Sequence, residues 1–156
     1  MNSRTLRVAL LCAVLAGPTV AHAGACDLHV ADGWVRAAPP GAAVMAGYAT
    51  IHNRADTAAV LGTISSPQFA SVELHETIDD AGVMRMRRIG NAAIPPAGEL
   101  RLEPSGKHLM LIGPRAALVE GDFVDLVVEG CEPAFQTRLR VRNAAAEPRG
   151  HDHHAH

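Results

Sequence analysis

The stretch Lys107-His-Leu-Met-Leu-Ile112 alternates leucine with a histidine and a methionine. Successive side chains of a β-strand point to opposite faces of the sheet, so residues two apart share a face. Leu109 and Leu111 are therefore predicted to point into the core, while His108 and Met110 project together from the other face. This alternation predicts a half-buried β-strand.

Short stretches of similar pattern recur along the body of the chain, separated by turns rich in Gly and Pro, and none has a sustained helical period. Eight or nine short strands at this spacing predict an all-β fold, specifically an antiparallel β-sandwich. The expected strands are His29–Arg36, Ala46–Asn53, Ala58–Ser65, Ser71–Thr77, Val83–Ile89, Glu99–Glu103, His108–Ile112, Asp122–Val128 and Ala134–Val141.

The composition fits one globular domain and points towards metal chemistry. A length of 156 residues is typical of one domain, and 48% hydrophobic with 19% charged residues argues against wholesale disorder. The formal net charge of −2 argues against an unaided binder of nucleic acid or of an anionic membrane. Nine His and five Met supply borderline and soft metal ligands in a chain with few aromatic residues.

Residues 1–23 are predicted to be a secretory signal peptide. Arg4 and Arg7 precede a short apolar run, and Ala21-His-Ala23 is a small-x-small cleavage site. The run is too short to span a bilayer, so we expect a periplasmic protein without stable membrane insertion. Lipidation of Cys26 is the alternative, and it fits less well because Ala23 stands where an aliphatic residue is expected.

Cleavage would leave two cysteines, Cys26 and Cys131. In an oxidising compartment they are predicted to form one disulfide that ties the N-terminal strand to a late strand. The alternative is metal binding by the thiolates, which the lack of a Cys or His at ligand spacing disfavours. Closing a loop of this length would stabilise the domain by about 4–5 kcal/mol in the chain-entropy model.

Two further potential ligands lie on a predicted hairpin. If Asp79-Asp-Ala-Gly82 is a four-residue turn, His75 lies directly opposite Met86, with Cα atoms about 4.5–5.5 Å apart. If this hairpin meets the strand that carries His108 and Met110, the four side chains form a site of two His and two Met. Met84 shares the face of Met86 and is either a spare ligand or core, so it is left out of the set.

The chemistry of this set favours a soft, monovalent ion. A thioether is a neutral ligand that holds Cu(I) well and Zn²⁺ or Mg²⁺ poorly. However, a strand Met is more often part of the core, and a strand His is more often a surface or hydrogen-bonded residue. Spacing alone therefore leaves both interpretations open.

The four residues also match the signature of a known family. The sequence resembles the periplasmic copper chaperone PCu(A)C family, whose pattern is His, ten residues, Met, twenty-one residues and His-x-Met; His75, Met86, His108 and Met110 have this spacing. Glu76 departs from the pattern, since many members carry a second Met there. The stretches Trp34–Gly41, Ala46–Asn53 and Ile94–Gly98 are also similar, and the resemblance runs from about Ala31 to Val141.

The resemblance implies a cupredoxin-like β-sandwich over residues 24–142 that binds Cu(I) through these four side chains. It also implies delivery of copper to the Cu(A) centre of cytochrome c oxidase. The acceptor would be the copper subunit of the oxidase, a Sco-type thiol protein, or both. We expect the protein to be a monomer.

The C-terminal residues 143–156 are predicted to be a disordered tail, because nothing in them is apolar enough to form a core. The tail ends in four histidines that suit Cu(II) and would form an auxiliary site. Asp152 and Ala155 interrupt the run, which favours a native tail over an expression tag. The tail histidines are His151, His153, His154 and His156.

The remaining histidines, His29 and His52, lie on predicted strands without an evident ligand partner and are interpreted as structural. A binding and transfer protein is favoured over an enzyme, because no nucleophile–base motif, nucleotide loop or carboxylate pair is evident. A cupredoxin-type electron carrier would need a Cys thiolate near the motif. A copper-buffering or resistance protein is not distinguished by the sequence.

Overall fold

The structure is a computed structural model that describes residues 26–131 and 133–143. The predicted signal peptide, and the tail from residue 144 onward, lie outside the described residues. The described part contains eleven β-strands and no helix, so the all-β prediction is confirmed. No helix capable of crossing a membrane is therefore found in that part.

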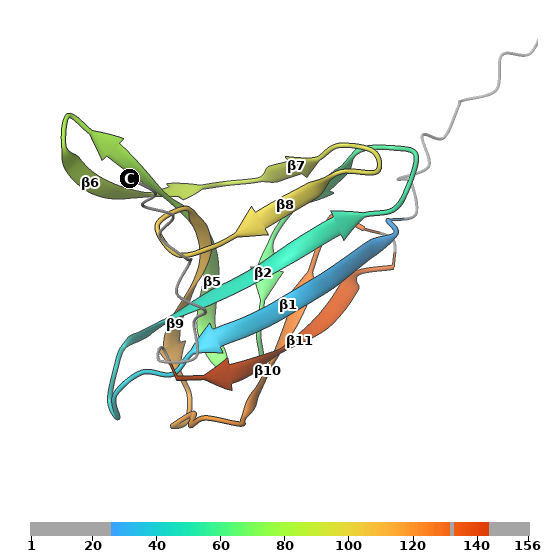
Figure 1. The fold of residues 1–156 in the computed structure, drawn as a ribbon. Helices are drawn as coiled ribbons and strands as arrows, with labels where there is room; N and C mark the ends of the chain where they lie inside the picture. Colours follow the sequence, from blue (N-terminus) through green and yellow to red (C-terminus); the bar gives the residue numbers. More distant parts are fainter. Residues whose placement is uncertain (1–25, 132, 144–156) are drawn as a thin grey trace, which may run out of the picture.

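The strands are short and mostly antiparallel (Figure 1). Most of them coincide with predicted strands to within a few residues. Their bounds are β1 Leu28–Arg36, β2 Val44–Asn53, β3 Ala59–Leu61, β4 Ile64–Ser65, β5 Phe69–Asp80, β6 Val83–Ile89, β7 Ala92–Ile94, β8 Glu99–Leu102, β9 Lys107–Pro114, β10 Phe123–Val128 and β11 Phe135–Arg142.

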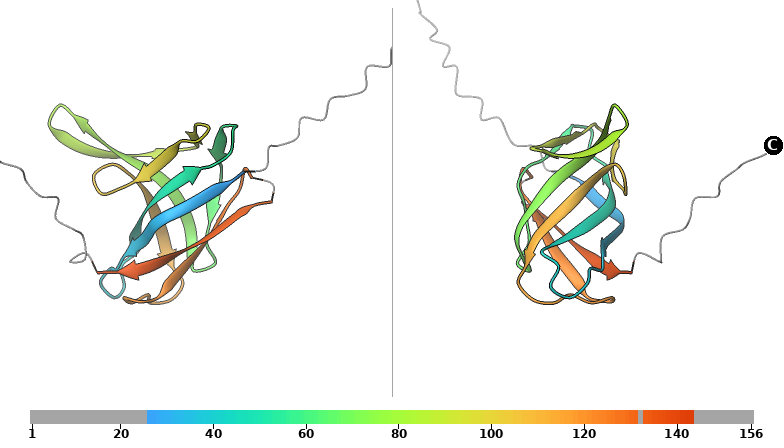
Figure 2. Two further views of the ribbon diagram at one scale, coloured as in Figure 1. Left: turned by 45° about the vertical axis from the view of Figure 1, so that its right-hand side comes forward. Right: turned by 90° about the vertical axis from the view of Figure 1, so that its left-hand side faces the viewer.

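The main sheet closes on itself. Seven strands follow the order β1-β11-β10-β4-β5-β9-β2, and β2 pairs back to β1. Strand β8 adds to β2, β6 adds to β5, and β3 pairs with β7 in a small separate sheet. The expected two-sheet sandwich is thus replaced by a barrel-like sheet, in which the β1–β11 pair is parallel (Figure 2).

A β-bulge in β1 helps to close the barrel. The register with β2 shifts between Ala31 and Trp34, and Asp32 has a positive φ of 52°. A Cβ atom on Gly33 would lie 2.4 Å from Cδ2 of Leu139, so a larger residue here would require the Leu139 side chain to shift. Because a bulge bends its strand, the second half of β1 pairs with both β2 and β11.

The barrel interior is filled by the inward faces of the strands. Leu109 and Leu111 are 3% and 0% exposed, and Val72 and Leu74 are buried with them. The prediction that these leucines face the core is confirmed. The outward face of β5 and β9 is therefore the one that carries His75, His108 and Met110.

The predicted strand Ala58–Ser65 is in fact two, β3 and β4, interrupted at Gly62. The Gly62 amide donates a hydrogen bond of 2.9 Å to the carbonyl of Glu129, and a Cβ atom there would lie 2.8 Å from that oxygen. Close backbone approach therefore breaks the strand. Strand β7 was missed, since three residues are too few for alternation to be recognised.

The hairpin of β5 and β6 has a tighter turn than predicted. Strand β5 runs to Asp80, and the turn is the two-residue loop Ala81-Gly82, with φ of 55° and 84°. Positive φ at both positions is characteristic of a type I′ turn, whose twist matches that of the strands. The predicted register is therefore wrong, because Met86 lies opposite Thr77 and not opposite His75.

Candidate metal centre

The two predicted ligand histidines lie on adjacent strands. His75 of β5 is the direct cross-strand partner of His108 of β9, and the ring centroids are 6.1 Å apart. Met110 lies two residues beyond His108 on the same face, half-buried and opposite Glu73. The barrel sheet thus brings three of the four predicted ligands to one patch of its outer face.

Met86 reaches this patch from β6. Met86 is the cross-strand partner of Thr77, which lies two residues beyond His75 on β5. The side chains of Met86 and His75 therefore lie on the same face of the hairpin. The Sδ atom of Met86 lies 3.3 Å from Nε2 of His108. The thioether therefore meets the imidazole in spite of the corrected register.

Met84 is not part of the core. Its side chain is 58% exposed, nearly the same as the 59% of Met86. It shares the outward face of β6, one alternate position closer to the turn. Packing in the core therefore does not account for the presence of Met84 or Met86 on this strand.

A carboxylate orients His75. Its Nε2 atom lies 2.8 Å from Oε2 of Glu73, and Nη1 of Arg88 lies 3.5 Å from the other carboxylate oxygen. The hydrogen bond with His75 and the charge of Arg88 lower the pKa of Glu73, against the opposing effect of burial. An ionised carboxylate only accepts hydrogen bonds, so Nε2 of His75 donates. The other ring nitrogen, Nδ1, then carries a lone pair, and it is buried with no hydrogen-bond partner.

A backbone carbonyl orients His108 in a similar way. Nδ1 of His108 lies 3.1 Å from the carbonyl oxygen of Gly106, which can only accept, so Nδ1 donates. Nε2 is left with a lone pair that faces the Met86 sulfur. His108 is only 7% exposed. In the neutral ring Nε2 and the Met86 sulfur therefore turn lone pairs towards each other, an arrangement that a cation would stabilise.

The opposite face of the hairpin carries its ion pairs. Glu76 lies 2.9 Å from Nζ of Lys107 on β9 and 3.0 Å from Nη2 of Arg87 on β6. Hydrogen bonds from Lys107 and then Arg87 lower the pKa of Glu76. These pairs tie β6, β5 and β9 together, and Glu76 makes them on the face opposite to His75 and Met86.

The described residues contain no group of three or more His, Cys, Asp or Glu that could hold a metal. A metal at this patch would therefore depend on the thioethers. Cys26 and Cys131 are joined in a disulfide with Cα atoms 5.3 Å apart. Their sulfurs are consequently not available as thiolates, and the predicted tail site lies outside the described residues.

His29 and His52 are not isolated from other ligands, and that expectation was wrong. They are direct cross-strand partners on β1 and β2, with ring centroids 6.3 Å apart. Nδ1 of His52 lies 3.5 Å from Oε2 of Glu99 on β8. Only the strand register reveals this pair, because the two residues are far apart in the sequence.

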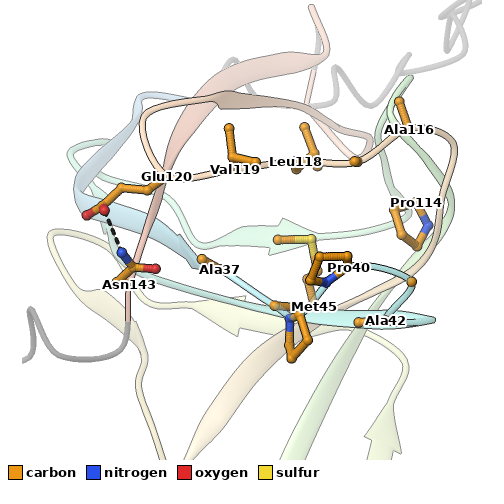
Figure 3. Close-up of a pocket in the computed structure, with 14 residues that line it drawn as sticks. Ala37, Pro40, Ala42, Met45, Pro114, Ala116, Leu118, Val119, Glu120 and Asn143 are labelled. Atoms are coloured by element: carbon orange, nitrogen blue, oxygen red, sulfur yellow. Dashed lines mark hydrogen bonds between the residues drawn. The ribbon is translucent and has the colours of Figure 1, made fainter.

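An apolar cavity of about 320 Å³ lies at the end of the barrel away from the β5–β6 hairpin (Figure 3). Pro40, Met45 and Leu118 contribute to its lining. Met45 is its one Met, and no His or Cys lines it. The cavity therefore does not resemble the His and Met patch.

Comparison with known sequences gives a family match. A family model described as "Putative lipoprotein LpqE-like" matches residues 28–130. A protein of Leifsonia xyli subsp. xyli, described as "Putative lipoprotein Lxx21020", is 29% identical over 144 residues, which cover 81% of this chain and 82% of that protein. An uncharacterized protein of Rickettsia prowazekii, RP573, is 32% identical over 77 residues, covering 48% of this chain and 42% of that protein.

Solved structures share the fold. The copper-bound PCuAC domain from PmoF2 has a TM-score of 0.61 at 20% identity, with 74% of this chain and 92% of that chain covered. The apo PCuAC domain from PmoF1 has a TM-score of 0.59 at 21% identity, covering 74% and 93%. The solution structure of CuI-DR1885 from Deinococcus radiodurans has a TM-score of 0.57 at 27% identity, covering 72% and 76%.

Proposed function

The chain belongs to the LpqE-like family, which is the PCuAC family, and from this premise we propose that it is a copper chaperone. Its cargo is Cu(I), held by His75, Met86, His108 and Met110. The cupredoxin-like description of the barrel is part of the same proposal. The protein carries copper and does not catalyse a reaction.

The observation that carries this proposal is a pair of ring nitrogens beside a thioether, one of them without a hydrogen-bond partner and the other in contact with the sulfur. Nδ1 of His75 is buried without a partner, and Nε2 of His108 faces the Met86 sulfur at 3.3 Å. Buried polar atoms without partners are costly, so an unpartnered nitrogen at such a patch calls for a ligand. Neutral imidazole and thioether donors suit Cu(I), and they add no negative charge that would favour divalent ions.

The positions of the ligands suit release as well as binding. His75 and His108 belong to barrel strands, whereas Met86 belongs to β6, which pairs only with β5 among the described strands. All residues of β6 except Ile89 are exposed. An acceptor can therefore displace the Met86 thioether first, while the two imidazoles still hold the ion.

X-ray absorption of the Cu(I)-loaded protein tests the ligand set. We expect two sulfur and two nitrogen neighbours in the wild type, and one sulfur fewer in Met86→Leu. Met84→Leu is the matched control, since Met84 has the same exposure, strand and face. Equal loss of sulfur in both variants, or no change in Met86→Leu, would contradict the assignment.

The acceptor we propose is the Cu(A) centre of cytochrome c oxidase, reached directly or through a Sco-type thiol protein. This follows from the family resemblance and the exchangeable ligands. Deletion of the gene should lower oxidase activity, and added copper should restore it. Normal activity in the deletion strain under copper limitation would instead favour a copper-buffering or resistance protein.

We further propose that the protein is exported and works in the periplasm. The family and the Leifsonia relative are described as lipoproteins, and a disulfide suits an oxidising compartment. With Sγ of Cys26 bonded to Cys131, that sulfur is not free to carry a lipid. Fractionation of cells should therefore release the protein with the periplasmic contents, without detergent.

A blue-copper electron carrier is the less favoured alternative. Such a site needs a Cys thiolate, and both described cysteines are in the disulfide. Addition of Cu(II) should therefore produce no intense visible absorption. The histidine-rich tail remains a proposal for an auxiliary Cu(II) site, and truncation after Arg149 should lower the Cu(II) stoichiometry.

A further inference from the structure

We propose that His29 and His52 form a second metal site, which binds a divalent cation such as Cu(II). The two side chains lie opposite each other on β1 and β2, with ring centroids 6.3 Å apart and an interplanar angle of 28°. Glu99 of β8 is the next residue in the same row across the sheet. This site is separate from the His and Met patch and does not depend on the copper chaperone function.

Glu99 gives His52 a defined donor atom. Its Oε2 lies 3.5 Å from Nδ1 of His52, while its Oε1 accepts a hydrogen bond of 2.6 Å from Nε of Arg101. A carboxylate on this side of the ring favours the tautomer with the proton on Nδ1. Nε2 of His52 then carries the lone pair for a metal. A carboxylate behind a ligating imidazole is the common arrangement around protein-bound metal ions. Glu99 serves here as the orienting group, and the two imidazoles are the ligands.

The surroundings decide which ion the pair suits. The adjacent row on the same sheet face consists of Ala31, Thr50 and Arg101, so neither row supplies a thioether or thiolate. Imidazole nitrogen with water in the remaining positions suits Cu(II) and similar divalent ions. The side chain of His52 is 37% exposed and that of Glu99 36%, so water can complete the coordination shell.

The backbone under the pair is held firmly. Asn53 follows His52 directly, is 1% exposed, and donates from Nδ2 to the carbonyls of Thr57, Ile94 and Pro95 at 2.8, 3.2 and 3.1 Å. The disulfide at Cys26 anchors the chain two residues before β1. A rigid frame keeps the two side chains opposite each other and limits the entropy lost on binding.

An NMR titration of the full chain with Cu(II) tests the site, because the paramagnetic ion broadens resonances of nearby nuclei. In the wild type, Cu(II) added beyond the amount that the histidine-rich tail takes up should broaden the amide signals of residues 28–30 and 51–53. His29→Gln and His52→Gln should each abolish this local broadening. Glu99→Gln should weaken the local affinity by roughly 10–100-fold.

Glu103→Gln is the matched control, since it removes an exposed carboxylate directly after β8. It should leave the broadening in place. Both histidines are on the surface, so the variants should keep the remaining amide spectrum, which verifies folding. Broadening that persists in the two His variants, or that occurs only outside residues 28–30 and 51–53, would overturn the proposal.

Discussion

The molecule contains two cross-strand histidine pairs that differ in their surroundings. His75 and His108 lie on β5 and β9 with ring centroids 6.1 Å apart, and His29 and His52 lie on β1 and β2 at 6.3 Å. The first pair is covered and meets the Met86 sulfur. The second pair is open to water and has no soft donor in its rows.

If both proposals hold, facing imidazoles alone do not determine which metal ion is bound. Each pair has a carboxylate beside one ring, Glu73 in the first and Glu99 in the second. What differs is burial and sulfur, and these properties separate a Cu(I) ligand set from a Cu(II) ligand set. In Figure 1 the β5–β6 hairpin projects at the left, while β1 begins and β2 ends at the right.

Removal of the disulfide should have the largest effect. It should lower the stability of the fold and leave Cu(I) binding at the His75–His108 pair unchanged. We expect Cys26→Ala with Cys131→Ala to lower the free energy of unfolding by about 4–5 kcal/mol, because the unfolded chain gains freedom. Denaturant unfolding measures this loss. Cu(I) binding of the folded variant should be unchanged. If Cu(I) binding were lost while the fold remained, the disulfide and the His75–His108 pair would not be independent of each other.

Substitution of one ligand should separate the two pairs. His108→Gln should weaken Cu(I) binding by more than the ~100-fold that loss of an outer partner can cost, and Cu(II) broadening at residues 51–53 should persist. Competition with a Cu(I) chelator measures the affinity. Because His108 is buried, Met86→Leu is a second variant that tests the same site from an exposed position. Unchanged Cu(I) affinity in both would exclude the first pair as the site.

The carboxylates beside the two pairs, Glu73 and Glu99, allow a test with a smaller expected effect, in which each substitution should weaken binding at its own pair only. Glu73→Gln should weaken Cu(I) binding by about 10–100-fold, because the carboxylate that holds Nε2 of His75 is lost and no longer fixes the orientation of the ring. Glu99→Gln should leave Cu(I) affinity unchanged and weaken Cu(II) at the second pair. The same chelator competition and NMR titration serve both variants. Equal effects of the two substitutions on both ions would show that they act through general electrostatics.

A residue of β10 provides a pH reference away from both pairs. Hydrogen bonds from Arg138 at 2.7 Å and Gln68 at 3.2 Å lower the pKa of Asp125 below its ordinary 3.8. Its stabilising contribution is therefore present above that value and is lost as the pH falls through the lowered pKa. Asp125→Asn should thus reduce the stability at neutral pH, with a smaller difference from wild type in strong acid. Urea unfolding at both pH values measures it, and an equal difference at both would contradict this origin.

Much of the placement of the four candidate ligands could be predicted from the sequence. The alternation around Leu109 and Leu111 placed His108 and Met110 on the outer face, and the motif spacing selected His75 and Met86. The register of the hairpin could not be predicted, because both a four-residue turn and the two-residue Ala81-Gly82 turn suit the same residues. In the observed register Met86 lies diagonal to His75 on β5, and its long side chain still reaches His108 on β9.

The second pair could not be predicted at all. His29 and His52 are separated by a bulge and a long loop, and a shift of one residue would place them on opposite faces. Their pairing follows from the β1–β2 register that closes the barrel. The break at Gly62 likewise depends on Glu129, a residue far along the chain.

The sequence by itself determined most of the strands, their inward and outward faces, and the His and Met side chains available for a soft metal. These properties depend on the two-residue period of a strand and on side-chain chemistry, both of which are local. The tertiary structure decided the closure of the sheet, the pairing of His75 with His108 and of His29 with His52, and the free nitrogen of His75. These depend on strand register and long-range contacts, because cross-strand neighbours are set by the whole sheet and not by any single segment.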